Sequence, residues 1–132
     1  MQQFTTTEKF IYRGQPLPGI PLLVDKCEYP VSPVTNYMMH LTLERGSVTS
    51  DKTLKSHSDA LYDYFSWMEA KGLAWDQEPR LTPGGKEISN LSLYQKWSQD
   101  NYRKPDGTPL KNSTINLRTS RIEEFYKWDK DV

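Results

Sequence analysis

Apolar side chains recur at steps of three and four residues in the segment between Ser50 and Gly72. The apolar positions of this segment are Leu54, Leu61, Tyr64, Phe65 and Met68. At 100° per residue they cluster on one face of a helix, and the polar positions lie on the other. Ser50 or Asp51 suits the N-cap, and Gly72 suits the C-terminal stop. The spacing therefore predicts a long amphipathic helix that ends at Gly72.

Three more segments have helical spacing. They run from Pro33, capped by Ser32, to a stop at Gly46, from Ser89 or Asn90 to Tyr102, and from Asn112 or Ser113 to about Lys130. Proline at the first helical position is typical of a helix start, as are serine and asparagine at the cap. One face of the last segment carries Ile115, Ile122, Phe125 and Tyr126. We therefore predict four helices in the chain.

The first 30 residues lack helical spacing, and we call them the N-terminal arm. Apolar runs at residues 10–12 and 20–24 flank a turn that is rich in glycine and proline. This arrangement is typical of two short strands or a loose hairpin. Pro21 has no backbone N–H, which keeps the second run out of a central position in a sheet. Residues 73–90 have no usable periodicity, so we predict only a connection there.

The expected architecture is mainly α, with a compact four-helix domain over residues 31–132. The N-terminal arm, residues 1–30, precedes it as an extended segment or a short β-hairpin. The chain has 132 residues, which is enough for one domain with its own core. Four Trp, eight Tyr and four Phe supply bulky core side chains.

Composition excludes several classes of protein. The longest apolar runs are far shorter than the roughly 20 residues of a membrane-spanning helix. The N-terminus lacks the charged and then apolar order of a signal peptide, so we expect a cytoplasmic protein. A single cysteine, Cys27, and two histidines provide neither an internal disulfide nor a set of metal ligands. We expect no metal and no cofactor.

The formal net charge is zero, with 17 Lys and Arg against 17 Asp and Glu, yet the charges are unevenly placed. Residues 96–121 carry six Lys and Arg against two Asp, whereas residues 122–132 have more acids than bases. The start of the fourth helix, residues 111–116, adds hydroxyls, an amide and free backbone N–H groups, which can hold phosphate oxygens. A solvated surface with ordinary helix caps accounts for the same residues. Both interpretations remain open from the charge pattern alone.

Two segments together resemble a known family. The first runs from Ser50 to His57 and continues through Leu61, Phe65, Trp67, Met68 and Gly72. The second comprises residues 113–122 and the aromatic group at 125–128. They are similar to the first long helix and the last helix of the core-binding domain of tyrosine recombinases and phage integrases. Residues 91–103 match the intervening helix by position, and the resemblance covers roughly residues 10–130.

The resemblance implies a SAM-like helical bundle that clamps one face of duplex DNA at a recombination site. In the family a catalytic domain follows, with two Arg, a Lys, a His-x-x-Arg element and a nucleophilic Tyr. That set is not recognisable here, because Leu43 and Ala60 stand three residues after His40 and His57. We therefore expect no strand cleavage by this chain. The implied partners are double-stranded DNA and a catalytic domain in the same parent protein, with a tetramer forming only on DNA.

The candidate DNA-binding residues lie at the starts of the second and fourth helices and in the turn between the third and fourth. They are Lys52, Thr53, Lys55, Ser56, Lys104, Lys111, Ser113, Thr114, Asn116, Arg118 and Arg121. The chain departs from the family at residues 57–59 and at Asn116, where cations are frequent. Each lost phosphate contact lowers the salt slope by roughly 0.9 log unit, so we expect weak binding.

Structural interpretations compete with several of these assignments. His57 falls on the apolar face of its helix, which favours a core histidine with a hydrogen-bond partner over a DNA contact. Arg118 points toward the apolar face of the last helix, which suits an ion-paired or snorkelling side chain as well as a DNA ligand. Trp67, Trp97 and Trp128 are most simply packing residues. The alternative function is a helical protein-interaction module without DNA affinity.

Overall fold

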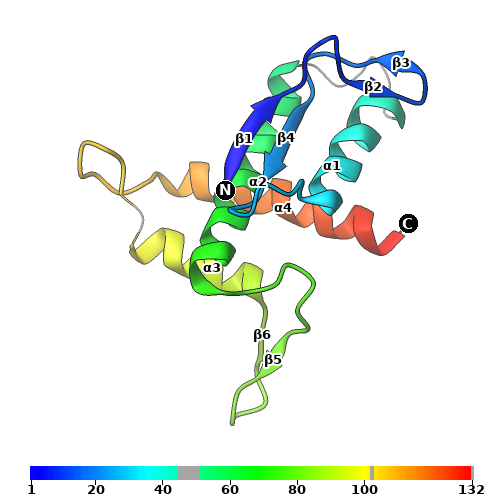
Figure 1. The fold of residues 1–132 in the computed structure, drawn as a ribbon. Coiled ribbons are helices and arrows are strands. Elements are labelled where there is room, and N and C mark those ends of the chain that lie inside the picture. Colours follow the sequence, from blue (N-terminus) through cyan, green and yellow to red (C-terminus); the bar gives the residue numbers. More distant parts are fainter. Residues whose placement is uncertain (45–50, 102, 132) are drawn as a thin grey trace.

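The computed structural model describes residues 1–44, 51–101 and 103–131 (Figure 1). The described part contains four α-helices: α1 (Ser32–Met39), α2 (Asp51–Lys71), α3 (Asn90–Asp100) and α4 (Asn112–Asp131). A π-helical turn, η1 (His40–Glu44), continues α1. The predicted helices are confirmed at these positions, but α1 begins at Ser32 itself, with Val31 and not Ser32 at the N-cap. The proposed cap at Ser50 and the proposed stops at Gly46 and Tyr102 lie outside the described residues. Small antiparallel sheets accompany the helices, so the structure is mixed and only roughly compatible with the mainly α expectation.

The ends of α2 and α3 follow from a few local hydrogen bonds. Gly72 has a φ of +69°, the left-handed conformation that glycine adopts without strain. The Gly72 N–H donates to the Glu69 carbonyl at 3.3 Å, and the Leu73 N–H donates to the Met68 carbonyl at 2.9 Å. This pair of bonds is a Schellman motif, which terminates α2. At the start of α3, the Ser89 side chain accepts from the N–H of Ser92, and the Ser92 side chain accepts from the N–H of Ser89.

The N-terminal arm forms two separate strand pairs. Strand β1 (Gln2–Thr5) pairs antiparallel with β4 (Pro21–Val24), and β2 (Ile11–Tyr12) pairs with β3 (Gln15–Pro16). The two predicted strands therefore exist, but each has a different partner from the one expected. Thr6 fixes this arrangement, because its hydroxyl donates to the Leu17 carbonyl and accepts from the Ile20 N–H. Pro21 lies opposite Thr5 at the end of a two-stranded sheet.

The N-terminal arm packs against the helices. Ile20 and Leu23 are buried, and β4 contacts both α1 and α2. Glu69 of α2 accepts hydrogen bonds from the terminal amino group of Met1 at 2.9 Å and from the Lys26 N–H at 3.0 Å. The bond from the amino group holds the pKa of the Glu69 carboxyl below its usual range. The sheet β1–β4 thus covers one side of the helical core.

The core lies between α2 and α4. Every apolar position predicted for the inner face of α2 is buried. From α4, Ile115, Ile122 and Phe125 are buried, and Tyr126 is half-buried. The ring of Phe125 lies 5.4 Å from that of Tyr37 and 6.0 Å from that of Phe65, with rings near perpendicular. Such edge-to-face pairs add to the stabilisation from burial.

The segment after α2 contains a hairpin that the sequence did not predict. Strands β5 (Arg80–Leu81) and β6 (Glu87–Ile88) pair antiparallel, and the hairpin projects from the helices (Figure 1). The Thr82 N–H donates to the Lys86 carbonyl, and the Lys86 N–H donates to the Thr82 hydroxyl. Two-residue strands are too short to produce a visible alternation of polar and apolar positions, which is why residues 73–90 gave no strand signal. None of the helices in the described ranges is both long and apolar enough to cross a bilayer.

Candidate nucleic-acid interface

A basic groove runs between the N-terminal halves of α2 and α4. It has a volume of about 310 Å³. The residues that line it are Lys52, Lys55, Ser56, Asp59, Ala60, Thr114, Leu117, Arg118 and Arg121. Six of these are candidate DNA-binding residues from the sequence, although the two helices lie about 60 positions apart in the chain. We call this feature the basic groove.

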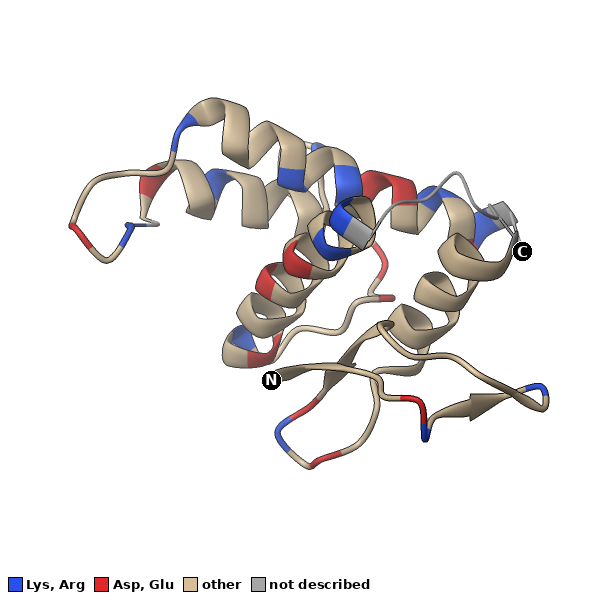
Figure 2. Ribbon diagram, turned by 90° about the horizontal axis from the view of Figure 1, so that it is seen from above, with Lys and Arg blue, Asp and Glu red and all other residues tan. Residues whose placement is uncertain are grey.

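Helical spacing explains why these side chains meet. On α2 the groove residues stand three or four positions apart, and those on α4 follow the same spacing. Side chains at such steps lie on one stripe of a helix. Because α2 and α4 pack along each other, their two stripes face a common groove. Figure 2 shows the Lys and Arg positions at the start of α2 close to those in the first half of α4.

Among the described residues, carboxylate partners are found for Lys55, Arg118 and Arg121 of the basic groove. The Lys55 ammonium lies 3.3 Å from Asp59, and the Arg121 guanidinium lies 3.6 Å from Glu124. Lys55 is 73% exposed and the Arg121 side chain 25% exposed. A phosphate that enters the groove would therefore compete with carboxylates for these cations. The exposed Lys55–Asp59 pair is of the weak kind, worth about 0–1 kcal/mol, so a phosphate can displace Asp59 from Lys55 at little cost.

Arg118 of the groove takes part in a network of side chains that joins three helices. Its guanidinium lies 3.4 Å from the carboxylate of Asp63, which also accepts a hydrogen bond from the Tyr94 hydroxyl. Burial and the Asp63 carboxylate raise the pKa of Tyr94, so this phenol stays a proton donor. The three side chains link α4, α2 and α3. The ion-paired role that the sequence left open for Arg118 is therefore supported.

Asp59 lines the basic groove but is not among the candidate residues from the sequence. One of its oxygens accepts from the Gln3 side-chain amide at 3.0 Å, and the other faces Lys55. The Gln3 amide also donates to the Ser58 hydroxyl at 2.6 Å. Strand β1 thereby holds a negative charge inside the basic groove. The four-residue step from Lys55 to Asp59 is the signal that could have revealed the ion pair.

The remaining candidate residues lie outside the groove lining. Asn116 is exposed and stands about 200° around the helix from Thr114, on the opposite side of α4. Lys111 and Ser113 are exposed at the start of α4, and the Lys111 carbonyl accepts the N–H groups of Thr114 and Ile115. Thr53 on α2 and Lys104 in the turn before α4 are half-buried. The candidates therefore divide between the basic groove and the region around the start of α4, except for Thr53, which lies on α2 outside the groove lining.

His57 is a core residue, as its position on the apolar face predicts. It is fully buried, with Nε2 3.5 Å from a Glu124 oxygen and Nδ1 3.4 Å from the Tyr37 hydroxyl. Glu124 thus contacts both a buried histidine and Arg121 of the groove. The tryptophans named in the sequence analysis also have packing roles. Trp67 is buried, and Trp97 and Trp128 are half-buried against other aromatic rings.

The described part of the chain contains no group of three or more His, Cys, Asp or Glu side chains positioned to hold a metal ion. Cys27 is exposed and has a free thiol. No protein-family model, no curated protein and no solved structure matches the chain. The basic groove, where cations from two helices meet, is therefore the main functional candidate in the described structure.

Proposed function

We propose that the chain binds double-stranded DNA through the basic groove and acts as the core-binding domain of a site-specific tyrosine recombinase. The observation that carries the proposal is the convergence of Lys52, Lys55, Arg118 and Arg121 from two helices on one surface. The carboxylate of Asp59 lines the groove beside them, and those of Asp63 and Glu124 pair with Arg118 and Arg121, so four cations face three carboxylates. A surface of this charge attracts phosphate groups even though the whole chain is neutral.

The chemistry of the groove suits contacts to the DNA backbone. Lysine and arginine supply charge, and the hydroxyls of Ser56 and Thr114 add hydrogen-bond donors for phosphate oxygens. Contacts of this kind position a protein on a duplex and carry little sequence information. We therefore assign the groove a positioning role, in a SAM-like bundle that works beside a catalytic domain of the same parent protein. In this proposal the chain itself is not an enzyme, is cytoplasmic and assembles as a tetramer only on DNA.

Titration of a fluorescent duplex by anisotropy tests the proposal. We expect a Kd of about 10⁻⁴–10⁻⁶ M at physiological salt, the range of non-specific binding, and tighter binding at low salt. Three phosphate contacts would weaken binding by about 40-fold between roughly 50 mM and 200 mM salt. An absence of binding at low salt, or binding that does not respond to salt, would contradict DNA binding. That result would favour the alternative, a helical protein-interaction module.

Asp59→Asn should strengthen duplex binding. The substitution removes the carboxylate that faces Lys55 and keeps an acceptor for the Gln3 amide. One additional available cation is expected to raise affinity by about three- to tenfold at low salt. The same anisotropy titration measures the change. Asp100→Asn, an exposed position on α3 outside the groove, removes the same charge as a matched control. Equal effects of the two substitutions would show that Asp59 has no local role.

A further inference from the structure

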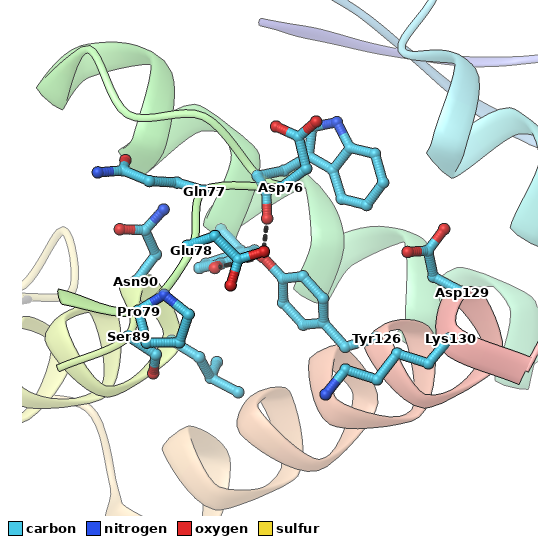
Figure 3. Close-up of a pocket in the computed structure, with 12 residues that line it drawn as sticks. Asp76, Gln77, Glu78, Pro79, Ser89, Asn90, Tyr126, Asp129 and Lys130 are labelled. Atoms are coloured by element: carbon cyan, nitrogen blue, oxygen red, sulfur yellow. Dashed lines mark hydrogen bonds between the residues drawn. The ribbon is translucent and has the colours of Figure 1, made fainter. Parts of the chain in front are cut away.

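A second cavity lies between the connection after α2, the start of α3 and the last part of α4 (Figure 3). Its volume is about 400 Å³, and in the described structure it shares no lining residue with the basic groove. Tyr64, Trp75 and Tyr126 contribute aromatic walls, and Leu91 adds an apolar side chain. We call this cavity the aromatic pocket. Its size falls within the range of ligand pockets, about 300–1,000 Å³.

Internal hydrogen bonds hold the walls of the aromatic pocket in place. The Tyr126 hydroxyl donates to the Trp75 carbonyl at 2.7 Å and lies 2.7 Å from the Tyr64 hydroxyl (Figure 3). Since the Tyr126 proton is used in that bond, Tyr64 donates to Tyr126. The Asn90 side chain donates to the Ala74 carbonyl at 2.8 Å, which fixes the connection beside the pocket. The walls are therefore formed before any ligand arrives, which lowers the entropic cost of binding.

The rim of the aromatic pocket is acidic. Asp76, Glu78 and Asp129 are exposed there, against one cation, Lys130. Figure 3 shows the three carboxylates on different sides of Tyr126. Burial, together with the nearby charges of Asp76 and Asp129, raises the pKa of Tyr126 to about 12. The phenol thus remains neutral, and the negative charge of the pocket comes from the rim carboxylates.

We propose that the aromatic pocket docks an arginine side chain from a basic segment of a partner protein. A guanidinium stacks on aromatic faces, here those of Trp75 and Tyr126, whose rings lie 6.5 Å apart at 27°. It also presents a planar fork of N–H donors that matches carboxylates such as those of the rim. The same carboxylates repel phosphate groups, so nucleic acid is disfavoured at this pocket. The site is distinct from the basic groove and does not depend on DNA binding.

NMR titration of the ¹⁵N-labelled chain with a blocked glycine pentapeptide containing one central arginine tests the inference. We expect saturable shifts of the Trp75 indole N–H, assigned with Trp75→Phe, and a Kd on the order of 1 mM. The matching citrulline peptide, which has the same shape and no charge, should produce no saturable shift. A lysine peptide should bind at least about threefold more weakly, because its ammonium lacks the planar fork. Equal binding by the citrulline or lysine peptide would overturn the assignment, as would the absence of saturation with the arginine peptide.

Removal of rim charge provides the second arm of the test. Asp76→Asn combined with Glu78→Gln should weaken binding of the arginine peptide by about fivefold. Glu8→Gln combined with Asp100→Asn removes the same number of exposed carboxylates elsewhere and should leave the Kd unchanged. All four side chains are exposed, so folding is expected to survive both pairs of substitutions. An equal loss of affinity in the two double variants would reduce the effect to net charge and overturn the docking site.

Discussion

Alanine at Lys52, Lys55 and Arg121 should lower duplex affinity about 10³-fold at roughly 50 mM salt, since each lost phosphate contact costs about tenfold there. All three side chains line the basic groove, and the Lys55 side chain is more exposed than those of Arg118 and Arg121. The slope of log K against log salt should become shallower by about 2.7. Anisotropy titration at several salt concentrations measures both quantities. We leave Arg118 in place because its ion pair with Asp63 joins two helices.

A matched variant separates the groove from the general effect of charge. Lys9, Lys71 and Lys96 are exposed cations outside the basic groove. Replacing these three by alanine changes the net charge by the same amount and should reduce affinity far less. If the two triple variants weaken binding equally, the groove has no special role and diffuse attraction explains the binding. Thermal unfolding by circular dichroism should show a larger loss of stability in the groove variant, because Arg121 is mostly buried and paired with Glu124, so affinities are compared at a temperature where both variants are folded.

The helices were predictable because their signals are local. The apolar face of α2 is set by positions three and four residues apart, and its end depends on Gly72. The start of α3 depends on two serines, Ser89 and Ser92, within one turn. Each of these signals lies within a few residues of the structure that it specifies. Their positions could therefore be read without knowledge of the rest of the fold.

The pairing of strands was not predictable in the same way. Strand β1 consists of exposed residues and lacks the alternation that marks a strand with one buried face. Its partner β4 lies about 20 residues away, and buried Leu23 holds β4 against the helices. The register therefore depends on contacts between distant parts of the chain. Strand β2 (Ile11–Tyr12) instead pairs with the adjacent β3.

The candidate site was predictable only in part, and helical phase explains the division. Thr114, Arg118 and Arg121 share one stripe of α4 and line the basic groove, whereas Asn116 lies about 200° away from Thr114. Asn116 was chosen as a candidate at the start of the fourth helix. The turn of 100° per residue along a helix would have been enough to place it on a different side of α4 from Thr114, Arg118 and Arg121. The role of Asp59 could not be derived so simply, because the Gln3 side chain that holds it comes from β1.

Phe125→Ala should destabilise the fold by about 3–5 kcal/mol, a large share of the 5–15 kcal/mol that is typical of domains. The Phe125 side chain is fully buried, and its ring lies 5.4 Å from that of Tyr37, 6.0 Å from that of Phe65 and 5.7 Å from that of Trp75. These neighbours come from α1, α2 and the connection after α2. These three rings cannot all move into the cavity that alanine leaves, since each is fixed in a different helix or connection. Urea unfolding should show a lower midpoint with an unchanged m value.

Phe4→Ala removes the same atoms at a position where the phenylalanine side chain is 52% exposed in strand β1. Its cost should be about 1 kcal/mol or less, because little apolar surface is taken from water there. The difference between the two substitutions therefore measures the packing around Phe125 rather than the chemistry of a phenylalanine-to-alanine change. Similar costs for both would mean that α4 does not pack on α1 and α2 through Phe125. The basic groove would then lose its support as well, because the same packing of α4 on α2 brings Arg121 close to Lys55.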